Sequence, residues 1–107
     1  MAVNRSRRDR RRAPTHPGAV LREDVLPALG KPKAEIARML GVSRQTLYDI
    51  LNEKQPVTPE MAVRFGKLLG TSPESWLNMQ RALDLWRAQR SIDLDRIPTL
   101  KADTIAA

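Results

Sequence analysis

The chain has 107 residues, no cysteine, one histidine and a formal net charge of +7. Without cysteine it cannot form a disulfide, a cysteine metal site or a thiol nucleophile, and the lone His16 argues against a histidine-based metal or catalytic cluster. The hydrophobic share of 41% is that of one globular domain, and no apolar run reaches the roughly 18 residues that a membrane-spanning helix needs. We therefore expect a protein that is not an enzyme, binds no cofactor and has no membrane partner.

The positive charge is concentrated near the N-terminus. Residues 1–12 contain six arginines and one aspartate, whereas the rest of the chain has 13 basic and 11 acidic groups. Because like charges repel one another and this segment has nothing apolar to bury, we expect residues 1–15 to form a disordered arm. The stretch 13–18 is rich in helix breakers where a secretory signal would have an apolar core, so we expect cytoplasmic localisation, at the nucleoid when DNA is bound.

The arm has three interpretations. It is either a solubilising tail, or a DNA element that places Arg10, Arg11 and Arg12 on phosphates or in a minor groove, or a contact for RNA or an acidic protein surface.

Apolar periodicity predicts three short helices in the first half of the chain. The first covers 19–29, and Pro27 should end or kink this helix near Leu26. A second helix is expected between Pro32 and Gly41, and Ser43 is a suitable N-cap for the third. The residues expected to face the core from the second and third helices are Ala34, Ala37, Leu40, Leu47, Ile50 and Leu51.

Two further helices and a tail complete the predicted order. Thr58 and Pro59 begin the fourth helix, and the fifth begins either with a Ser72 cap or with a Thr71…Glu74 capping box. The fold class is therefore all-α, with five helices in a domain over 16–90 and a tail over 91–107, which is either frayed or an extended segment that orders against a partner. The expected inner residues are Met61, Phe65, Leu68 and Leu69 on the fourth helix, and Trp76, Met79, Leu83 and Trp86 on the fifth.

The stretch 33–52 has the pattern of a helix-turn-helix. Ala37 is small where two helices would cross closely, and Gly41, four residues later, fits a turn that requires a positive φ. Leu47 and Ile50 are spaced to anchor the second helix on the first. A two-helix hairpin with a glycine turn is the alternative, although it does not require these residues in register.

The second helix of such a motif lies in the major groove of DNA, with its N-terminal residues at the base edges. Arg44 suits a guanine and Gln45 an adenine, each through two hydrogen bonds, whereas Thr46 either meets a thymine methyl or is half-buried. Asp49 either accepts from a cytosine or, as we expect, orients Arg44 or Arg38 through a salt bridge. The predicted base-reading residues are Arg44, Gln45, Thr46, Tyr48 and Asp49, and the predicted phosphate contacts in the motif are Lys33, Ser43 and Asn52.

A single helix-turn-helix contacts one half-site, so we expect a homodimer on half-sites about 34 Å apart. Leu77 and Leu85 lie off the inner face of the fifth helix, which suits a subunit contact. Isolated surface leucines without any partner are the alternative.

The stretches 16–18 (His-Pro-Gly), 40–44, 50–52 and 58–62, and above all 69–80 with 84–86, resemble the HigA-type antitoxins of bacterial toxin–antitoxin pairs. These antitoxins are in the Xre, or lambda-repressor-like, helix-turn-helix class. The resemblance implies a dimeric antitoxin that neutralises a small RelE-like ribonuclease toxin and represses the shared operon on operator DNA. Ala19 and Leu83 depart from the family, which often has an acidic and an aromatic residue there, and the arm and the tail are extensions.

The resemblance also implies a weak assignment for the toxin contact. The outer faces of the first helices often take part in these pairs, so Arg22, Glu23 and Asp24 are the candidates here. A stand-alone regulator of the same fold, without a toxin, is the alternative function. His16, beside Pro17 and Gly18, is expected to cap the first helix rather than to do chemistry.

Overall fold

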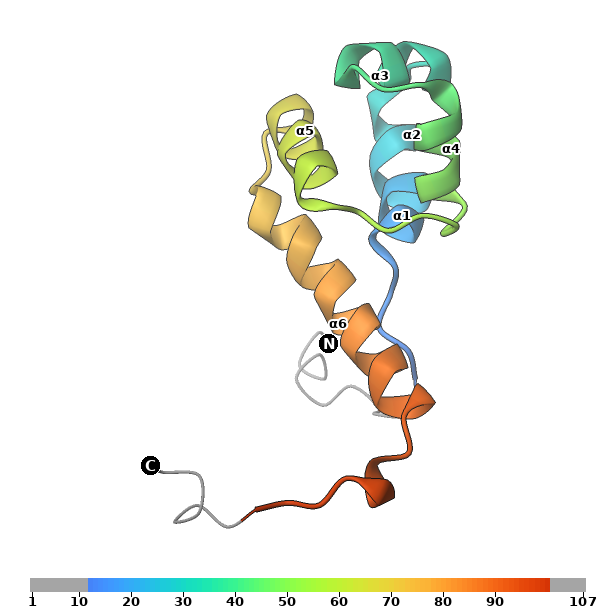
Figure 1. Cartoon of the computed structure of the whole chain (residues 1–107). Coiled ribbons are helices and arrows are strands. Elements are labelled where there is room, and N and C mark those ends of the chain that lie inside the picture. The colour runs from blue at the N-terminus through green and yellow to red at the C-terminus, as the bar shows by residue number, and fades with distance from the viewer. Residues whose placement is uncertain (1–11, 101–107) are drawn as a thin grey trace, which may run out of the picture.

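The structure, a computed structural model, describes residues 12–100. All regular secondary structure in this range is helical (Figure 1). A first helical unit is followed by α3 (Lys33–Leu40), α4 (Arg44–Leu51), α5 (Pro59–Leu69) and α6 (Pro73–Ser91), and the short 3-10 turn η3 (Leu94–Arg96) comes last. The predicted all-α class with five helices is confirmed.

The first helical unit is continuous but changes its winding in the middle. It consists of α1 (Pro17–Val20), the π-helical segment η2 (Leu21–Val25) and α2 (Leu26–Leu29). The unit begins two residues earlier than predicted, because His16 caps it. The predicted end near Leu26 is wrong: the N–H of Leu26 bonds to the carbonyl of Leu21, so a widened turn lies just before Pro27. Such a turn shifts the carbonyls that a proline ring would otherwise meet, and the helix continues to Leu29.

The starts of the other long helices follow their local sequence. Ser43, Thr58 and Ser72 each accept a hydrogen bond from the backbone N–H three residues later, at 3.0, 3.2 and 3.0 Å. Each satisfies one of the amides that a helix start leaves without a partner. At α6 this confirms the Ser72 cap with Pro73 in the first turn, one of the two predicted starts.

The core lies where the helices meet. Leu21, Ile36, Leu47 and Phe65 are all but completely buried, and the ring of Phe65 lies 6.0 Å from that of Trp76. Ala37 and Leu40 are buried as predicted, whereas Ala34 is exposed. Ile36 takes its place, because a helix that begins at Lys33 turns residues 36, 37 and 40 toward the core.

The longest helix, α6, has two different halves. Trp76, Gln80 and Leu83 are buried, and the predicted inner residues Met79 and Trp86 are only half-buried. Beyond Trp86 every described residue is exposed, and this end of α6 projects from the body of the protein (Figure 1). None of the helices in residues 12–100 has the length and apolarity to cross a membrane.

Candidate nucleic-acid interface

The helix-turn-helix is formed by α3 and α4. Ala37, at the predicted crossing, is 1% exposed, and Gly41 has a φ of 78°, the left-handed conformation that the turn requires. Leu47 and Ile50 are buried on the inner side of α4 and hold it against the body. These side chains pack α4 on the body through its inner side, which leaves its outer side in solvent.

Two arginines from outside the motif cap the C-terminal ends of its two helices. Nη1 of Arg64 donates to the carbonyl of Leu40 at 2.7 Å, and Nη1 of Arg22 donates to the carbonyl of Leu51 at 2.7 Å. Both carbonyls belong to the last turn of a helix, where free acceptors and the negative end of the helix dipole favour a cation. The caps join α3 to α5 and α4 to the first helical unit, so they brace the motif from both sides. The sequence analysis missed both.

Acidic neighbours hold the two arginines in place. Arg64 also bonds Glu60 through Nη2 at 2.9 Å, and Arg22 bonds Glu23 at 2.9 Å and Glu53 at 3.3 Å. The hydrogen bond to Glu23 is the main cause that raises the pKa of Arg22. Arg22 and Glu23, two of the three candidate toxin contacts, are thus engaged within the chain, whereas Asp24 is exposed.

The first helix approaches the end of α4 closely at Gly18. A side chain on Gly18 would collide with the carbonyl of Ile50, so only glycine allows this approach. His16, which is 4% exposed, lies beside it and accepts a hydrogen bond from the Gly18 N–H at Nδ1 over 2.8 Å. Burial lowers the pKa of His16, which keeps Nδ1 unprotonated and able to accept. The predicted role of His16 as a helix cap is confirmed.

The outer face of α4 presents polar side chains. Arg44, Gln45 and Tyr48 are exposed, and Thr46 and Asp49 are half-buried. Arg44 makes no ion pair with any residue in the described range. These predicted base-reading residues therefore lie on or beside one face, at the start and middle of the helix.

Asp49 has a different partner from the one predicted. Its Oδ1 accepts from Nε2 of Gln45 at 2.7 Å, one helical turn earlier, and no salt bridge joins it to Arg44 or Arg38 among residues 12–100. The expectation that Asp49 orients an arginine is wrong for the free protein, because the amide of Gln45 is within reach on the same face. Asp49 uses one N–H of Gln45, and the other N–H and Oε1 remain available for the edge of an adenine.

The predicted phosphate contacts border this face. Lys33 and Asn52 are exposed at the start of α3 and the end of α4. Ser43 is exposed, but its Oγ accepts from the Thr46 N–H and shares a 2.9 Å hydrogen bond with the Thr46 hydroxyl. Arg12 is exposed, whereas Arg10 and Arg11 lie outside the described residues.

The two predicted subunit-contact leucines differ in exposure. Leu85 is 56% exposed, but Leu77 is half-buried and packs against the core, so its predicted exposure is only partly correct. Between them lies Gln80, which the sequence analysis did not single out. Its Oε1 accepts from the backbone N–H of Val57 at 2.8 Å and its Nε2 donates to Asp84 at 3.0 Å. Gln80 thereby joins α6 to the loop that follows α4, the helix predicted to enter the major groove and called the recognition helix below.

No group of three or more histidine, cysteine, aspartate or glutamate side chains in residues 12–100 is arranged to hold a metal ion.

The helix-turn-helix family model matches residues 21–76, which include all of α3, α4 and α5. The chain belongs to this helix-turn-helix family. It is 41% identical over 75 residues to an "uncharacterized HTH-type transcriptional regulator" of Haemophilus influenzae, with 70% of each chain covered. It is 34% identical over 79 residues to antitoxin HigA-1 of Vibrio cholerae, with 74% of each chain covered. The predicted resemblance to HigA-type antitoxins is confirmed.

A solved structure gives the same result at the level of the fold. The chain resembles the antitoxin GraA in complex with its operator, with a TM-score of 0.73, 39% sequence identity, and coverage of 84% of this chain and 91% of that one. This helix-turn-helix chain therefore has the fold of an antitoxin whose solved complex contains operator DNA.

Proposed function

We propose that this chain is an antitoxin that binds operator DNA as a homodimer, represses its own operon, and neutralises a cognate RelE-like ribonuclease toxin. The observation that carries the DNA-binding half is the solvent face of α4. It offers Arg44, Gln45 and Tyr48 to a major groove, while buried side chains and the Arg22 cap hold the helix. The antitoxin half rests on likeness to antitoxins of known structure and name.

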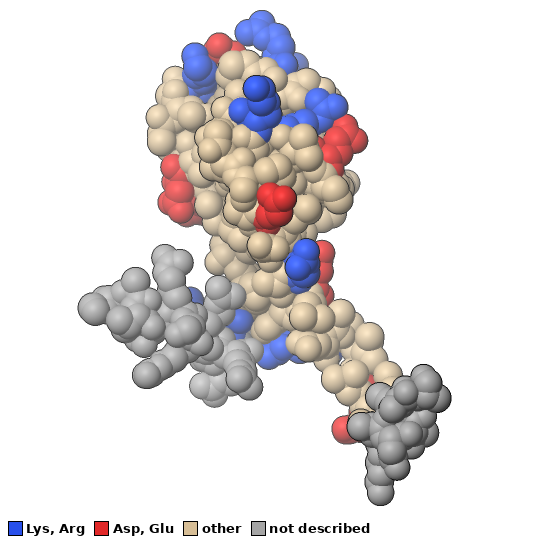
Figure 2. Space-filling view, turned by 90° about the vertical axis from the view of Figure 1, so that its left-hand side faces the viewer, with Lys and Arg blue, Asp and Glu red and all other residues tan. Residues whose placement is uncertain are grey.

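The groups on this surface have separate roles in the proposal. Arg44 reads a guanine through O6 and N7, and Gln45, held by Asp49, reads an adenine. Thr46 and Tyr48 make the remaining base contacts, and Lys33, Ser43, Asn52 and Arg12 contact phosphates, with Arg10 and Arg11 of the arm. Exposed Lys and Arg side chains gather at the end of the body where α3 lies (Figure 2).

The dimer brings two recognition helices to successive major grooves. Leu85 and the adjoining side of Leu77 make the subunit contact, and Asp24 with its neighbours Arg22 and Glu23 lies on a different surface that remains for the toxin. A stand-alone regulator without a toxin is the second candidate, and the Haemophilus influenzae relative, named only as a transcriptional regulator, favours it.

Growth of a bacterial host tests the antitoxin half. The reading frame adjacent to this gene is expressed alone and together with this chain. Arrest that co-expression relieves is the expected result. No arrest, or arrest without relief, overturns the antitoxin half and leaves the stand-alone regulator.

Protection of the DNA upstream of the gene tests the other half. Footprinting should give two protected half-sites about one helical turn apart. Absence of protection at micromolar protein overturns operator binding, whatever the growth assay gives.

A further inference from the structure

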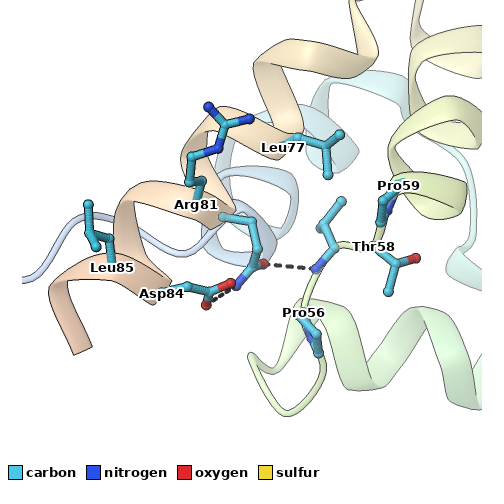
Figure 3. A pocket seen from close by; sticks show the side chains of 9 residues that line it. Pro56, Thr58, Pro59, Leu77, Arg81, Asp84 and Leu85 are labelled. Atoms are coloured by element: carbon cyan, nitrogen blue, oxygen red, sulfur yellow. Dashed lines mark hydrogen bonds between the residues drawn. The ribbon is translucent and has the colours of Figure 1, made fainter. Parts of the chain in front are cut away.

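A groove runs between α6 and the loop that follows the recognition helix. It has a volume of about 740 Å³ and is lined mainly by apolar side chains: Pro56, Val57, Pro59, Leu77 and Leu85. Figure 3 shows Leu77, Arg81 and Leu85 along one wall and the residues of the loop along the other. The hydrogen bonds of Gln80 to Val57 and Asp84 close its floor. The groove is therefore a formed surface and not a gap between mobile parts.

The segment after α6 exposes aliphatic side chains that do not pack on any other part of residues 12–100. Ile92, Leu94, Ile97 and Leu100 are 51%, 54%, 58% and 58% exposed. A single exposed leucine is ordinary in a globular protein, but here four large aliphatic side chains are exposed within nine residues, between the charged residues Asp93, Asp95 and Arg96. Such a segment indicates a binding surface that is uncovered in the single chain.

The tail leads away from the groove of its own chain. Ser91, where α6 ends, is about 9 Å beyond Leu85 along the helix axis, at ~1.5 Å per residue. From there the chain leads further from α5 and the loop before it (Figure 1). In a two-fold dimer whose axis passes beside Leu85 and is perpendicular to α6, the two α6 helices run antiparallel, so the end of one lies beside the N-terminal half of the other. That half contains Leu77, which lines the groove.

The two surfaces carry charges of opposite sign that can meet. The groove is lined by Arg81 and Asp84; Asp84 accepts from Gln80, and Arg81 makes no ion pair with any residue of the described range. The tail carries Asp93 and Asp95; Asp93 pairs at 3.3 Å with Arg96, whose side chain is 86% exposed, and accepts from the Asp95 N–H at 3.2 Å. An exposed pair of this kind has little energy to lose. An aspartate of the tail can therefore exchange it for a contact with Arg81.

We propose that residues 92–100 of one copy occupy the groove between α6 and the 56–59 loop of a second copy, so that two tails are exchanged across the dimer. This inference rests on the two-fold dimer of the proposed function, and it adds the tail of each copy to the subunit contact at Leu77 and Leu85. The aliphatic side chains of the tail enter the groove beside Leu77 and Leu85, and Asp93 or Asp95 meets Arg81. Because the loop follows α4, the exchanged tail contacts the partner next to the end of its α4 helix.

Cysteine cross-linking tests the exchange, because the chain has no cysteine of its own. Full-length Pro56→Cys and Ile97→Cys proteins are mixed under mild oxidation. A disulfide-linked pair containing one copy of each is the expected product. The matched control is Val63→Cys mixed with Ile97→Cys, since Val63 is 58% exposed on α5 and does not line the groove. Equal yields in both mixtures overturn the inference.

The other occupants give different products. If the tail covers its own groove, only the double variant Pro56→Cys with Ile97→Cys forms a disulfide, and that bond lies within one chain. If a different protein covers the tail, neither the mixture nor the double variant forms one. Both outcomes overturn the exchange.

A second measurement does not depend on engineered cysteines. Ile97→Asp should raise the dimer dissociation constant, measured by sedimentation, by about tenfold or more, because it puts a charge into an apolar groove. Val63→Asp adds the same charge at an aliphatic position that is equally exposed (58%) but lies on α5 and does not line the groove, and it should leave the constant within about twofold. If the two variants behave alike, the inference is wrong. Operator binding is also measured for both variants at saturating protein concentration. If both still bind operator DNA, equal dissociation constants contradict the tail exchange alone and leave the proposed function standing.

Discussion

The helix-turn-helix and the C-terminal segment present opposite chemistry to solvent. In the stretch 33–52 most exposed side chains are polar, with Ala34 and Met39 as exceptions, and the helices that bear them are held by buried leucines and arginine caps. In residues 85–100 the exposed side chains include five large aliphatic ones, and none of residues 12–100 covers them. A polar face on a fixed frame suits a groove lined with hydrogen-bonding groups, whereas an uncovered apolar segment suits another protein surface.

The comparison also separates two kinds of order. The recognition helix is positioned before it meets a partner, since contacts at both ends of α4 and along its inner side determine where it lies. In the exchange proposed above, the tail acquires its packing contacts from a second copy. Changes to the frame should therefore affect the free energy of unfolding, and changes to the exposed faces should affect binding alone.

The largest expected effect is on the frame, at Gly18. In Gly18→Ala the added Cβ meets the carbonyl of Ile50, so the first helix and α4 must separate. We expect a loss of about 3 kcal/mol in the free energy of unfolding, measured by urea denaturation. Gly30→Ala is the control, because a Cβ there meets nothing and only the positive φ of 66° is strained, at a cost of about 1 kcal/mol. A smaller loss in Gly18→Ala than in Gly30→Ala would contradict the close approach.

The next effect is on the reading face, at Arg44. Arg44→Ala should weaken operator binding by about 2 kcal/mol and relax the choice of base at one position, while the unfolding free energy stays unchanged. The measurement is a titration of operator DNA and of single-base variants of it. Lys67→Ala removes the same charge from an exposed position on α5 and should act little on either. If toxin neutralisation fell together with DNA binding, base readout would not be the role of Arg44.

A smaller effect is expected at the arginine caps. Arg64→Met keeps the aliphatic part of the side chain but removes the donor to the carbonyl of Leu40, and should cost about 1–2 kcal/mol of unfolding free energy. Glu60→Gln removes the exposed ion pair of Arg64 and keeps the cap, and should cost at most about 0.5 kcal/mol. Thermal or urea unfolding of both variants gives the comparison. Equal losses would mean that the ion pair, and not the cap, stabilises the motif.

What the sequence predicts correctly here depends on local interactions. Ser43, Thr58 and Ser72 cap helices because their partners are three residues away, and Gly41 is recognised from its place between two periodic segments. Arg64 and Leu40 are 24 residues apart, so the pairing of this cap has no local signal, and the same is true of Arg22. Gln80 was overlooked because a polar residue among apolar ones gives no sign of a distant backbone N–H.

Two of the wrong predictions have local causes as well. The bond from Gln45 to Asp49 spans one helical turn, and the spacing alone gives reason to consider it before a salt bridge to Arg44. Pro27 was expected to end or kink a helix; the helix does not end there, because a widened turn before Pro27 removes the clash. The exposure of Leu77 depends on how α6 rests on the loop at Val57, which periodicity within α6 does not contain.

The smallest expected effect is a pH dependence of stability from His16. Burial lowers the pKa of His16 below 6.5 in the folded state, so the unfolded chain binds the proton more readily. The stabilisation is complete above pH 6.5 and is lost as the pH falls from 6.5 toward the lowered pKa, at no more than about 1.4 kcal/mol per pH unit. Protonation of Nδ1 also removes the acceptor for the Gly18 N–H, so the start of the first helix should fray in the same window. Unfolding free energies of the native chain and His16→Asn between pH 7.5 and 5 provide the measurement. Asparagine can still cap a helix but does not titrate, so the difference between the two proteins should shrink as the pH falls. A difference that stays constant over this range would mean that His16 does not titrate with folding.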